Sequence, residues 1–538
     1  MSSTPQVDIP GCGTVRGIQA DTQSTVAKFL NIPYATVTER WRPAVNAAPW
    51  IGVRDASVQG PVCPQPRTDN PLVSPNGITE VSEKDCLNLN IFAPQNRLNT
   101  SQPLIPVMVW IHGGAYRDGG NAMKLYDGTK LVAESMNIDC PVIVVTINYR
   151  LNFFGFLSSP ELVQDVQSDS RLSPNEKSVG NWGLLDQKIA LEWVRDHIAA
   201  FGGDPEKITA FGESAGAASI GYHMSIPAHH GLFQRAIMQS GAATSLTARP
   251  VEVINRKDFI PLCQYFEGRG VIDPNLSPQE KLEILRGIPA EELTAAGDDD
   301  RVFAFLPTVD DVLIHGDVQR WIHDPARYDP GVKAVMLGDC PDQGTTLVAG
   351  LGESSYVGWP GKLARHFPPG KSHKSFAHDL GTIYGVPESN PDAERISADM
   401  ISDAIFLYPI HATTVALMGT EGYSRPNDPL RLVRYRFDRP LSIPDLRCFG
   451  TAHHAIDLPF VFGPDLFTNR FSDADKELSR EVQRIWIRFA HGQVDDAEAE
   501  LNAIEFTAEG DIRKTPEQLN TWTRLSAEKL ALWQPGEQ

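Results

Sequence analysis

The chain has 538 residues, of which 41% are hydrophobic and 21% charged, a composition typical of a globular protein and not of a disordered or fibrous one. Forty-eight Lys and Arg against 67 Asp and Glu leave a formal net charge of -19. Because polyanions are held by an excess of positive charge, this balance argues against nucleic acid or an anionic membrane surface as the main partner. Solubility explains the acid excess.

The sequence has no pattern that indicates secretion, a membrane span or a bound cofactor. Residues 1–17 have no basic patch followed by an apolar run, so we expect no signal peptide and a cytoplasmic protein, with secretion as the alternative if a leader was trimmed. No window reaches the ~18 apolar residues of a membrane span. Seven scattered cysteines without a Cys-x-x-Cys pair indicate no zinc site. With no phosphate loop, dinucleotide fingerprint or metal constellation, we expect no cofactor and no metal.

Short apolar runs without polar alternation mark the expected strands. They occupy residues 105–111, 141–147, 208–212, 236–238 and 334–338. Such runs are typical of strands buried on both faces of a sheet. Residues 184–200 between the second and third run have a helical apolar pattern, and two glycines follow it. The alternation of strand and helix predicts an α/β fold with a mainly parallel twisted sheet flanked by helices.

Further helices are expected outside this alternation. They lie in residues 250–300, in residues 355–430 and in a closing amphipathic helix at 478–491. No repeat, low-complexity tract or linker divides the sequence. We therefore expect a single domain, residues 1–538, with large insertions over the active site.

The third expected strand is followed directly by Gly-Glu-Ser-Ala-Gly, residues 212–216, and then by a small apolar helix. This Gly-x-Ser-x-Gly pattern between a strand and a helix predicts a strained turn that presents Ser214 as a nucleophile. The positive N-terminal end of the following helix favours an oxyanion beside the serine. A buried serine in an ordinary glycine-rich turn is the alternative.

The first expected strand ends in His-Gly-Gly-Ala-Tyr, residues 112–116. Glycine lets backbone N–H groups approach a substrate oxygen that a larger side chain would obstruct. An ordinary Gly-Gly turn is the alternative here. The two motifs together are more specific than either one.

The sequence resembles the type B carboxylesterases, the branch of the α/β-hydrolase fold that includes lipases and cholinesterases. The resemblance extends over nearly the whole chain and includes residues 27–35, 85–91, 148–150, 180–187 and 201–205. It implies an oxyanion hole formed by the backbone N–H groups of Gly114, Ala115 and Ala215.

The resemblance also selects the general base. Residues 452–463 contain two adjacent histidines before Asp457 and a Leu-Pro-Phe-Val-Phe-Gly run. Counting back from Asp457, as the family pattern implies, selects His454, whereas counting forward from Gly450 would select His453. We choose His454 because the downstream anchor is longer, and we expect His453 to line the pocket or to pack. A histidine base would take the Ser214 proton and deliver it to the leaving alcohol.

The third triad position departs from the family pattern, which places an acid there. Gln343 occupies it, after the strand that ends at Gly338. An amide carries no charge to stabilise an imidazolium, and in a serine protease an Asp→Asn change at the acid costs about 10⁴ in turnover. Three explanations are open: Asp342 or Asp339 serves instead; Gln343 accepts the histidine proton through its oxygen; or Gln343 is an engineered change or a sign that hydrolysis was abandoned. Ser240 matches a family serine that supports the acid.

The substrate pocket is defined more weakly. Phe303 and Phe305 match the family's acyl-pocket region, with core packing as the alternative, and Glu213 and His453 are further pocket candidates. Residues 65–85 contain no tryptophan, which argues against a choline ester. By the same resemblance, Cys63 and Cys86 are candidates for a disulfide, with buried free thiols as the equal alternative.

These features predict a serine carboxylic-ester hydrolase that acts on a neutral or hydrophobic small-molecule ester, as a monomer or homodimer. A non-hydrolytic enzyme of secondary metabolism, catalysing elimination, cyclisation or acyl transfer on a related hydrophobic metabolite, is the alternative that Gln343 favours. A catalytically silent binding protein ranks last, because the serine and the oxyanion glycines are present.

Overall fold

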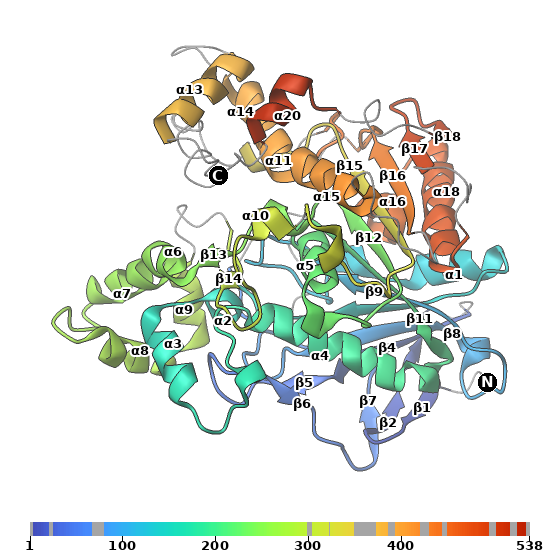
Figure 1. Ribbon diagram of the computed structural model, residues 1–538. Helices are drawn as coiled ribbons and strands as arrows, with labels where there is room; N and C mark the ends of the chain where they lie inside the picture. The colour runs from blue at the N-terminus through green and yellow to red at the C-terminus, as the bar shows by residue number, and fades with distance from the viewer. Residues whose placement is uncertain are drawn as a thin grey trace.

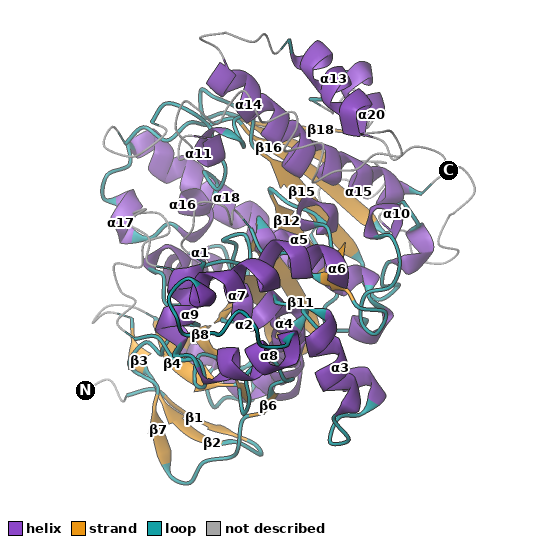
Figure 2. Cartoon of the chain, turned by 90° about the vertical axis from the view of Figure 1, so that its left-hand side faces the viewer, coloured by secondary structure: helices purple, strands orange, loops and turns teal. Residues whose placement is uncertain are grey.

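A mixed β-sheet with helices on both faces forms the frame of the protein (Figure 1). The computed structural model describes residues 4–20, 25–66, 80–297, 304–321, 323–348, 373–385, 393–419, 430–443, 449–493, 502–516 and 524–533. Within these residues the large sheet has eleven strands. Figure 2, turned by a quarter of a circle, shows the central strands running between the helices.

The large sheet is parallel in its centre and antiparallel at both edges. From one edge to the other its strands are β18 (Ile512–Pro516), β17 (Asn502–Phe506), β16 (Arg431–Phe437), β15 (Ala334–Asp339), β12 (Arg235–Gln239), β11 (Gly203–Glu213), β9 (Ile105–Ile111), β10 (Ile143–Ile147), β8 (Asn88–Pro94), β4 (Val26–Pro33) and β3 (Ile18–Gln19). Every neighbouring pair from β17 to β10 is parallel, and the remaining pairs are antiparallel. The expected mainly parallel sheet is confirmed.

Smaller strand pairs surround the large sheet. One small sheet joins β1 (Gln6–Ile9), β2 (Gly13–Arg16) and β7 (Val53–Asp55), and two pairs join β5 (Ala35–Thr36) to β6 (Val45–Asn46) and β13 (Arg249–Pro250) to β14 (Thr308–Val309). They lie outside the central strands that carry the candidate site.

Strand β9 shows why the central strands appear in the sequence as continuous apolar runs. Val107, Val109 and Ile111 belong to one hydrophobic cluster, whereas Met108 and Trp110 belong to another. Successive side chains of a strand point to opposite faces. Because each face of the sheet is covered by helices, both sets must be apolar, and no polar alternation appears.

Two groups of helices cover the two faces. One cluster includes side chains of α1 (Thr129–Asn137), α16 (Leu458–Phe462) and α18 (Asp473–Ala490), and the other includes α2 (Asn152–Phe156), α4 (Trp182–His197) and α5 (Ala215–Ser225). Further helices are α3 (Pro160–Ser168), α6 (Val251–Ile254), α7 (Ile260–Glu267), α8 (Pro278–Gly287), α9 (Ala290–Ala296), α10 (Val318–Trp321), α11 (Thr345–Val348), α13 (His373–Tyr384), α14 (Ala393–Ile401), α15 (Tyr408–Met418), α17 (Asp465–Thr468) and α20 (Ala527–Trp533). Helices α13, α14 and α20 lie together in both views (Figures 1 and 2).

The expected strands and helices occur where the structure describes the chain, and residues 298–300, 355–372, 386–392 and 420–429 of the two expected helical segments lie outside the described residues. Two helix boundaries differ from the expected ones for local reasons. The closing helix α18 begins before the expected residue 478, because the Ser472 side chain caps it by accepting from Asp475 N, and acidic residues occupy its first turn. The helix expected at 184–200 ends as an α-helix at His197 and finishes in a short 3₁₀ turn.

One helical stretch among the described residues, Arg395–Met418, has the length and apolar composition of a membrane span. It consists of α14, the π-helix η10 (Ser402–Leu407) and α15. Since 72% of its apolar window is buried inside the protein, it reads as a core helix, which passes the same test.

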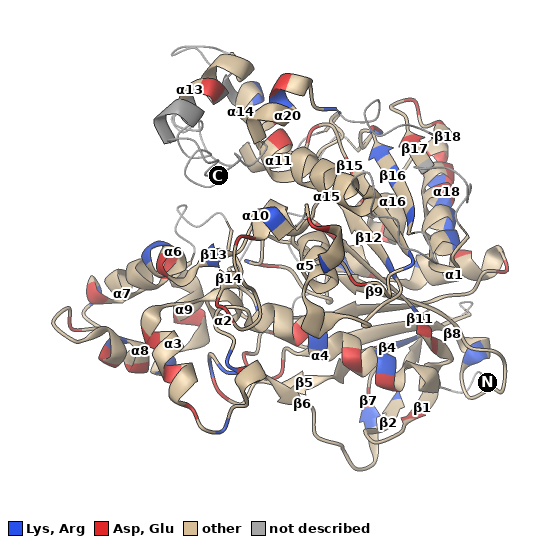
Figure 3. Cartoon of the chain, viewed as in Figure 1, with Lys and Arg blue, Asp and Glu red and all other residues tan. Residues whose placement is uncertain are grey.

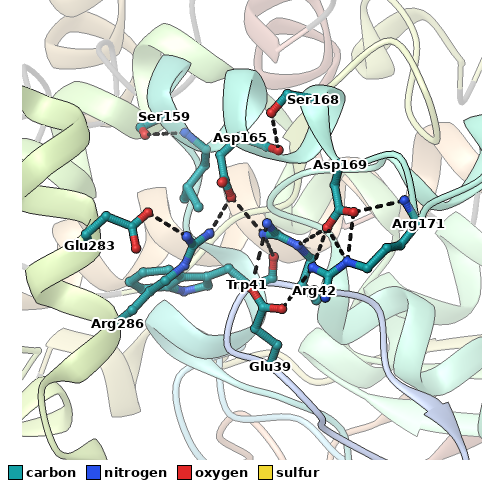
Figure 4. A network of polar contacts seen from close by, with 11 residues as sticks. Glu39, Trp41, Arg42, Ser159, Asp165, Ser168, Asp169, Arg171, Glu283 and Arg286 are labelled. Atoms are coloured by element: carbon teal, nitrogen blue, oxygen red, sulfur yellow. Dashed lines mark hydrogen bonds and ion pairs between the residues drawn. The ribbon is translucent and has the colours of Figure 1, made fainter.

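A network of ion pairs joins the helical segment 250–297 to the body of the protein (Figure 4). Asp165 of α3 accepts from Arg42 Nη1 at 2.8 Å and also pairs with Arg286 of α8. Arg42 Nε lies 3.1 Å from Asp169, which also pairs with Arg171 at 2.6 Å. The N-terminal region, α3 and α8 therefore meet through shared charges and not only through apolar contacts.

Charged residues of both signs are interspersed along the elements (Figure 3). One pair lies fully inside the protein: Arg150 Nη2 is 2.7 Å from Asp186 Oδ1, with side chains 1% and 0% exposed. Arg150 also donates from Nε to the other Asp186 oxygen and from Nη1 to the Arg42 carbonyl. The guanidinium thus joins α4 to the N-terminal region.

We expect Arg150→Met to lower the free energy of unfolding by about 3–5 kcal/mol, because it leaves the Asp186 charge buried without its partner. Urea denaturation measures the loss. The matched control is Arg16→Met, whose exposed pair with Asp55 spans 3.7 Å and should contribute at most about 1 kcal/mol. Equal losses in the two variants would contradict the expectation.

Candidate active site

Ser214 occupies a strained turn between β11 and α5. Its φ and ψ are 54° and -118°, a conformation rare for a residue with a side chain. Its N–H donates to the Gln239 carbonyl of the neighbouring strand β12 at 2.9 Å, which holds the turn in place. The serine therefore stands at the carboxyl end of the parallel strands, where sites in such sheets form.

Helix α5 approaches strand β9 too closely for a side chain. A Cβ on Gly216 would lie 1.9 Å from the Ile111 carbonyl oxygen, and one on Gly212 would lie 2.7 Å from the same atom. The two glycines of the sequence motif are thus required by the packing of backbone on backbone.

The glycine loop after β9 lies beside this turn. A Cβ on Gly113 would lie 3.1 Å from Ser214 Cβ and 2.6 Å from Glu213 Oε2. Gly114 and Ala115 follow directly with φ of 105° and 55°. The structure therefore brings the two halves expected to form the oxyanion hole, this loop and the α5 N-terminus at Ala215, to the same place.

The His112 side chain holds the backbone of the glycine loop through a hydrogen bond and a ring contact. Its Nδ1 is 2.8 Å from the Gly113 carbonyl, its ring stacks on Tyr149 at 4.4 Å, and its own carbonyl accepts from Tyr149 Oη at 2.8 Å. Burial lowers the pKa of His112 to about 4, so the ring is neutral at neutral pH. His112 thus holds the backbone and does not carry charge.

A hydrogen-bond chain joins the loop to helix α5. Tyr116 Oη is 3.1 Å from Ser219 Oγ, which donates to the Ala215 carbonyl at 2.8 Å. Gln187 of α4 donates to the same Ser219 oxygen at 3.1 Å. Both halves of the expected oxyanion hole are tied to one buried serine.

Gln343 contacts His454, the histidine that the downstream anchor selects. His454 Nδ1 lies 2.6 Å from Gln343 Oε1, and Gln343 Nε2 donates to Ser240 Oγ at 2.8 Å. Gln343 is fully buried. Because the amide N–H₂ is directed to Ser240, its oxygen faces the imidazole and accepts a hydrogen bond from Nδ1–H. This tautomer leaves Nε2 of a neutral His454 as a proton acceptor.

The two aspartates that could replace the missing acid have other partners. Asp339 pairs with Arg434 and with Arg524 Nε, the latter at 2.9 Å. Asp342 Oδ2 accepts from the Ala452 N–H at 3.1 Å, and its backbone pairs with the His453 segment. Each therefore stabilises a loop near the site.

Two contacts of His454 had no clear signal in the sequence. Its Nε2 lies 3.0 Å from Glu213 Oε1, with the two side chains 12% and 5% exposed. Its ring packs on Phe406 of η10, with centroids 4.4 Å apart. Glu213 was a pocket candidate only, and Phe406 lies in an apolar helix without a motif.

Two more residues of the histidine segment are buried behind the site. Asp457 accepts from Tyr435 Oη at 2.6 Å and from Gln239 Nε2 at 2.9 Å. Burial raises the pKa of Asp457 to about 6, and the nearby Glu213 charge adds to the shift. His453 Nδ1 donates to the His454 carbonyl at 2.7 Å, and burial lowers its pKa. His453 therefore packs and orients the loop.

Of the two pocket aromatics, Phe303 lies outside the described residues. Phe305 is fully buried, its ring packs edge-on to Phe153 at 5.0 Å, and its N–H donates to the Ala115 carbonyl at 3.1 Å. Its backbone thus braces the loop beside Ser214. Within the described ranges, no cluster of three or more His, Cys, Asp or Glu side chains could hold a metal ion.

The disulfide candidates Cys63 and Cys86 lie side by side as free cysteines, and the disulfide between them stays a prediction. Both are buried, and their sulfur atoms lie 2.7 Å apart. Burial raises the pKa of the Cys63 thiol well above its usual range, and the neighbouring Cys86 adds to the effect. The raised pKa favours the neutral form of the Cys63 thiol in the core.

Comparison with known proteins agrees with this site. A model of the carboxylesterase family matches residues 3–533. The para-nitrobenzyl esterase of Bacillus subtilis (strain 168) is 33% identical over 514 residues, 90% of each chain, and liver carboxylesterase B-1 of Rattus norvegicus is 29% identical over 586 residues, 98% of this chain and 95% of its own. A solved PNB esterase structure covers 99% of this chain and 100% of its own at 30% identity, with a TM-score of 0.74. The chain belongs to the carboxylesterase family, has the α/β-hydrolase fold and is a serine carboxylic ester hydrolase.

Proposed function

We propose that the protein hydrolyses a neutral or hydrophobic small-molecule ester through an acyl-enzyme on Ser214, with His454 as the base and Gln343 in the place of the usual acid. The observation that carries the proposal is the contact between His454 Nδ1 and Gln343 Oε1 at 2.6 Å. It orients the ring and selects the tautomer that a general base needs.

In this mechanism Ser214 Oγ attacks the ester carbonyl while His454 Nε2 takes its proton. The N–H groups of Gly114, Ala115 and Ala215 donate to the developing oxyanion. The imidazolium then protonates the leaving alcohol, and a water molecule repeats the sequence to release the acid. Gln343 orients the ring through Nδ1 but contributes no charge.

The buried carboxyl groups around the serine argue against an anionic substrate. Glu213 and Asp457 lie beside or behind His454, and burial raises the pKa of Asp118, which packs on the loop at Gly114, to about 6. A carboxylate or phosphate on the substrate would be repelled at short range in this poorly solvated site.

A second candidate is a non-hydrolytic step on a hydrophobic metabolite, and Gln343 is the observation that favours it. An uncharged third member weakens the proton transfer that repeated acylation needs. The polar donors beside Ser214 would still stabilise an enolate or alkoxide without a covalent intermediate.

We expect Ser214→Ala to abolish turnover of short p-nitrophenyl esters, because no other hydroxyl occupies the strained turn. The matched control is Ser225→Ala at the far end of α5, where the hydroxyl only donates to the Gly221 carbonyl. A phosphonate probe should label the wild type stoichiometrically and leave Ser214→Ala unlabelled. No labelling of Ser214 in the wild type, together with no turnover of these esters, would favour the non-hydrolytic candidate.

Gln343→Glu should raise esterase turnover about tenfold, which is about 1.4 kcal/mol of barrier, because it places a negative charge on the Nδ1 side of His454. Asp342→Ala is the control and should change the rate little, since Asp342 binds backbone. Steady-state rates on one p-nitrophenyl ester are the measurement. A large loss in Asp342→Ala with no gain in Gln343→Glu would identify Asp342 as the third member instead.

A further inference from the structure

One peptide group beside the candidate active site is held at both of its ends. Its carbonyl, that of Ala304, accepts from the Lys257 ammonium at 2.8 Å. Its N–H, that of Phe305, donates to the Ala115 carbonyl at 3.1 Å. We propose that Lys257 is a positioning residue of the oxyanion hole, which acts through this peptide group on the backbone of Ala115. The proposal rests on the proposed function of Ser214.

Lys257 lies on a wide helical turn whose shape the sequence explains. The π-helical turn η7 (Asn255–Phe259) joins α6 to α7, and α6 lies beside the strand pair β13 and β14 (Figure 1). Pro261 has no N–H to donate to the Lys257 carbonyl four residues before it. The Ile260 N–H donates instead to the Asn255 carbonyl, five residues before it. A proline therefore accompanies the wide turn that carries Lys257.

The Lys257 side chain is fixed between a buried carboxylate and an aromatic ring. Its Nζ lies 3.0 Å from Asp258 Oδ1, and the two side chains are 23% and 0% exposed. Burial raises the pKa of the Asp258 carboxyl group, and the Lys257 charge opposes that shift. The ammonium also lies 5.5 Å from the centre of the Phe305 ring, within the range of a cation–π contact. These contacts hold the ammonium against the Ala304 carbonyl.

The planar peptide group transmits this contact to the oxyanion loop. Its C=O and N–H lie in one plane and point in opposite directions, so a donor that fixes the oxygen also fixes the direction of the N–H. A charged donor makes a stronger hydrogen bond than a neutral one. It also polarises the peptide group, which strengthens the bond that the N–H makes. Lys257 therefore directs the Phe305 N–H toward Ala115 and strengthens that bond.

The backbone of the oxyanion loop needs this support because it is strained. Gly114, Ala115 and Tyr116 have φ of 105°, 55° and 56°. Residues with a side chain keep such a conformation only where the surrounding structure enforces it. The Tyr116 carbonyl accepts from the Asn152 N–H at 2.7 Å, and the Ala115 carbonyl accepts from the Phe305 N–H. Weakening of the second bond lets Ala115 relax, and its own N–H then loses its fixed direction toward the oxyanion.

Other contacts hold the chain after Phe305 but not the peptide before it. The Pro307 carbonyl accepts from the Arg249 N–H at 2.9 Å, next to the pairing of β13 with β14. Among the described residues, Lys257 is the side chain that bonds to the Ala304 carbonyl. It therefore fixes the end of this segment that lies against the oxyanion loop.

The test is Lys257→Met, which keeps an unbranched side chain and removes the charged donor. Because oxyanion donors act on the transition state, kcat for p-nitrophenyl acetate should fall about tenfold, while KM changes by less than about twofold. The fall should be the same for p-nitrophenyl hexanoate, because the oxyanion does not depend on the length of the acyl chain.

A trifluoromethyl ketone gives a second readout that a purely structural role would not change. Ser214 Oγ adds to its carbonyl carbon, the Ser214 proton passes to His454, and the former carbonyl oxygen carries the negative charge. The Ki of this ketone should rise about tenfold in Lys257→Met, in step with the fall in kcat/KM. The corresponding secondary alcohol, which forms no oxyanion, should keep its Ki.

The matched control is Lys281→Met on α8. Lys281 also pairs with a carboxylate, that of Glu267 at 2.7 Å, and donates to a backbone carbonyl, that of Pro274 at 3.0 Å. Its kinetics should equal those of the wild type. If Lys257→Met fails to fold because Asp258 is left unpaired, the double variant with Asp258→Asn is compared with Asp258→Asn alone. The same ratio of about tenfold in kcat is expected.

The proposal is overturned if Lys257→Met leaves kcat and the ketone Ki unchanged, or if the loss is confined to the longer acyl chain. A rise in KM alone, or an equal loss in Lys281→Met, also contradicts it. Failure of the proposed function is a different result, in which the phosphonate probe does not label Ser214 in the wild type. Labelled wild type with an unchanged Lys257→Met refutes only the role of Lys257.

Discussion

The contact between the backbones of helix α5 and strand β9 is the constraint on which the site depends. A Cβ on Gly216 would overlap the Ile111 carbonyl oxygen at 1.9 Å, so the helix reaches this position only with glycine there. The close approach forces the chain to reverse within one residue, and Ser214 takes the strain, with φ of 54°. The same reversal directs Glu213 to one side and the α5 N-terminus to the other. Changing the turn would displace nucleophile, oxyanion donors and carboxylate together.

Around His454 the site keeps the geometry of a catalytic triad. The negative charge that the family's acid would place at Nδ1 is absent, because Gln343 is neutral. Gln343 reaches Nδ1 because Ser240 takes its amide N–H₂, so the oxygen has one orientation that satisfies both contacts. A glutamate would fit the same space and bind the same ring nitrogen. The Gln343 amide therefore differs from a glutamate only in its lack of charge. Nearby Asp339 does not replace that charge, because it pairs with two arginines. The carboxyl group left against the ring is that of Glu213, which comes from the opposite side.

The sequence predicted the elements whose signals are local. The run at 105–111 is β9 with the same limits, because both faces of that strand are covered, and the five-residue motif identified Ser214 because a strand and a helix flank it. Asp457 and the apolar run after it selected His454, because the family pattern places the catalytic histidine three residues before that aspartate. The Phe406 and Glu213 contacts were not predicted. Phe406 reaches His454 through the packing of η10 on the Gln343 loop, a long-range contact that no spacing in the sequence encodes.

The packing of η10 also connects the site to the C-terminal end of the described chain. Ser402 Oγ accepts from the Gly344 N–H at 2.8 Å, so the turn after Gln343 is bonded to η10. Asp403, the next residue, accepts from Lys529 of α20 at 2.6 Å, and both α20 and η10 contribute to one small hydrophobic cluster. A displacement of α20 would therefore act first on η10 and then on the two residues that fix the His454 ring, the amide at Nδ1 and the aromatic face of Phe406. The orientation of the base is thus a property of this distant packing as much as of the motif that identifies the nucleophile.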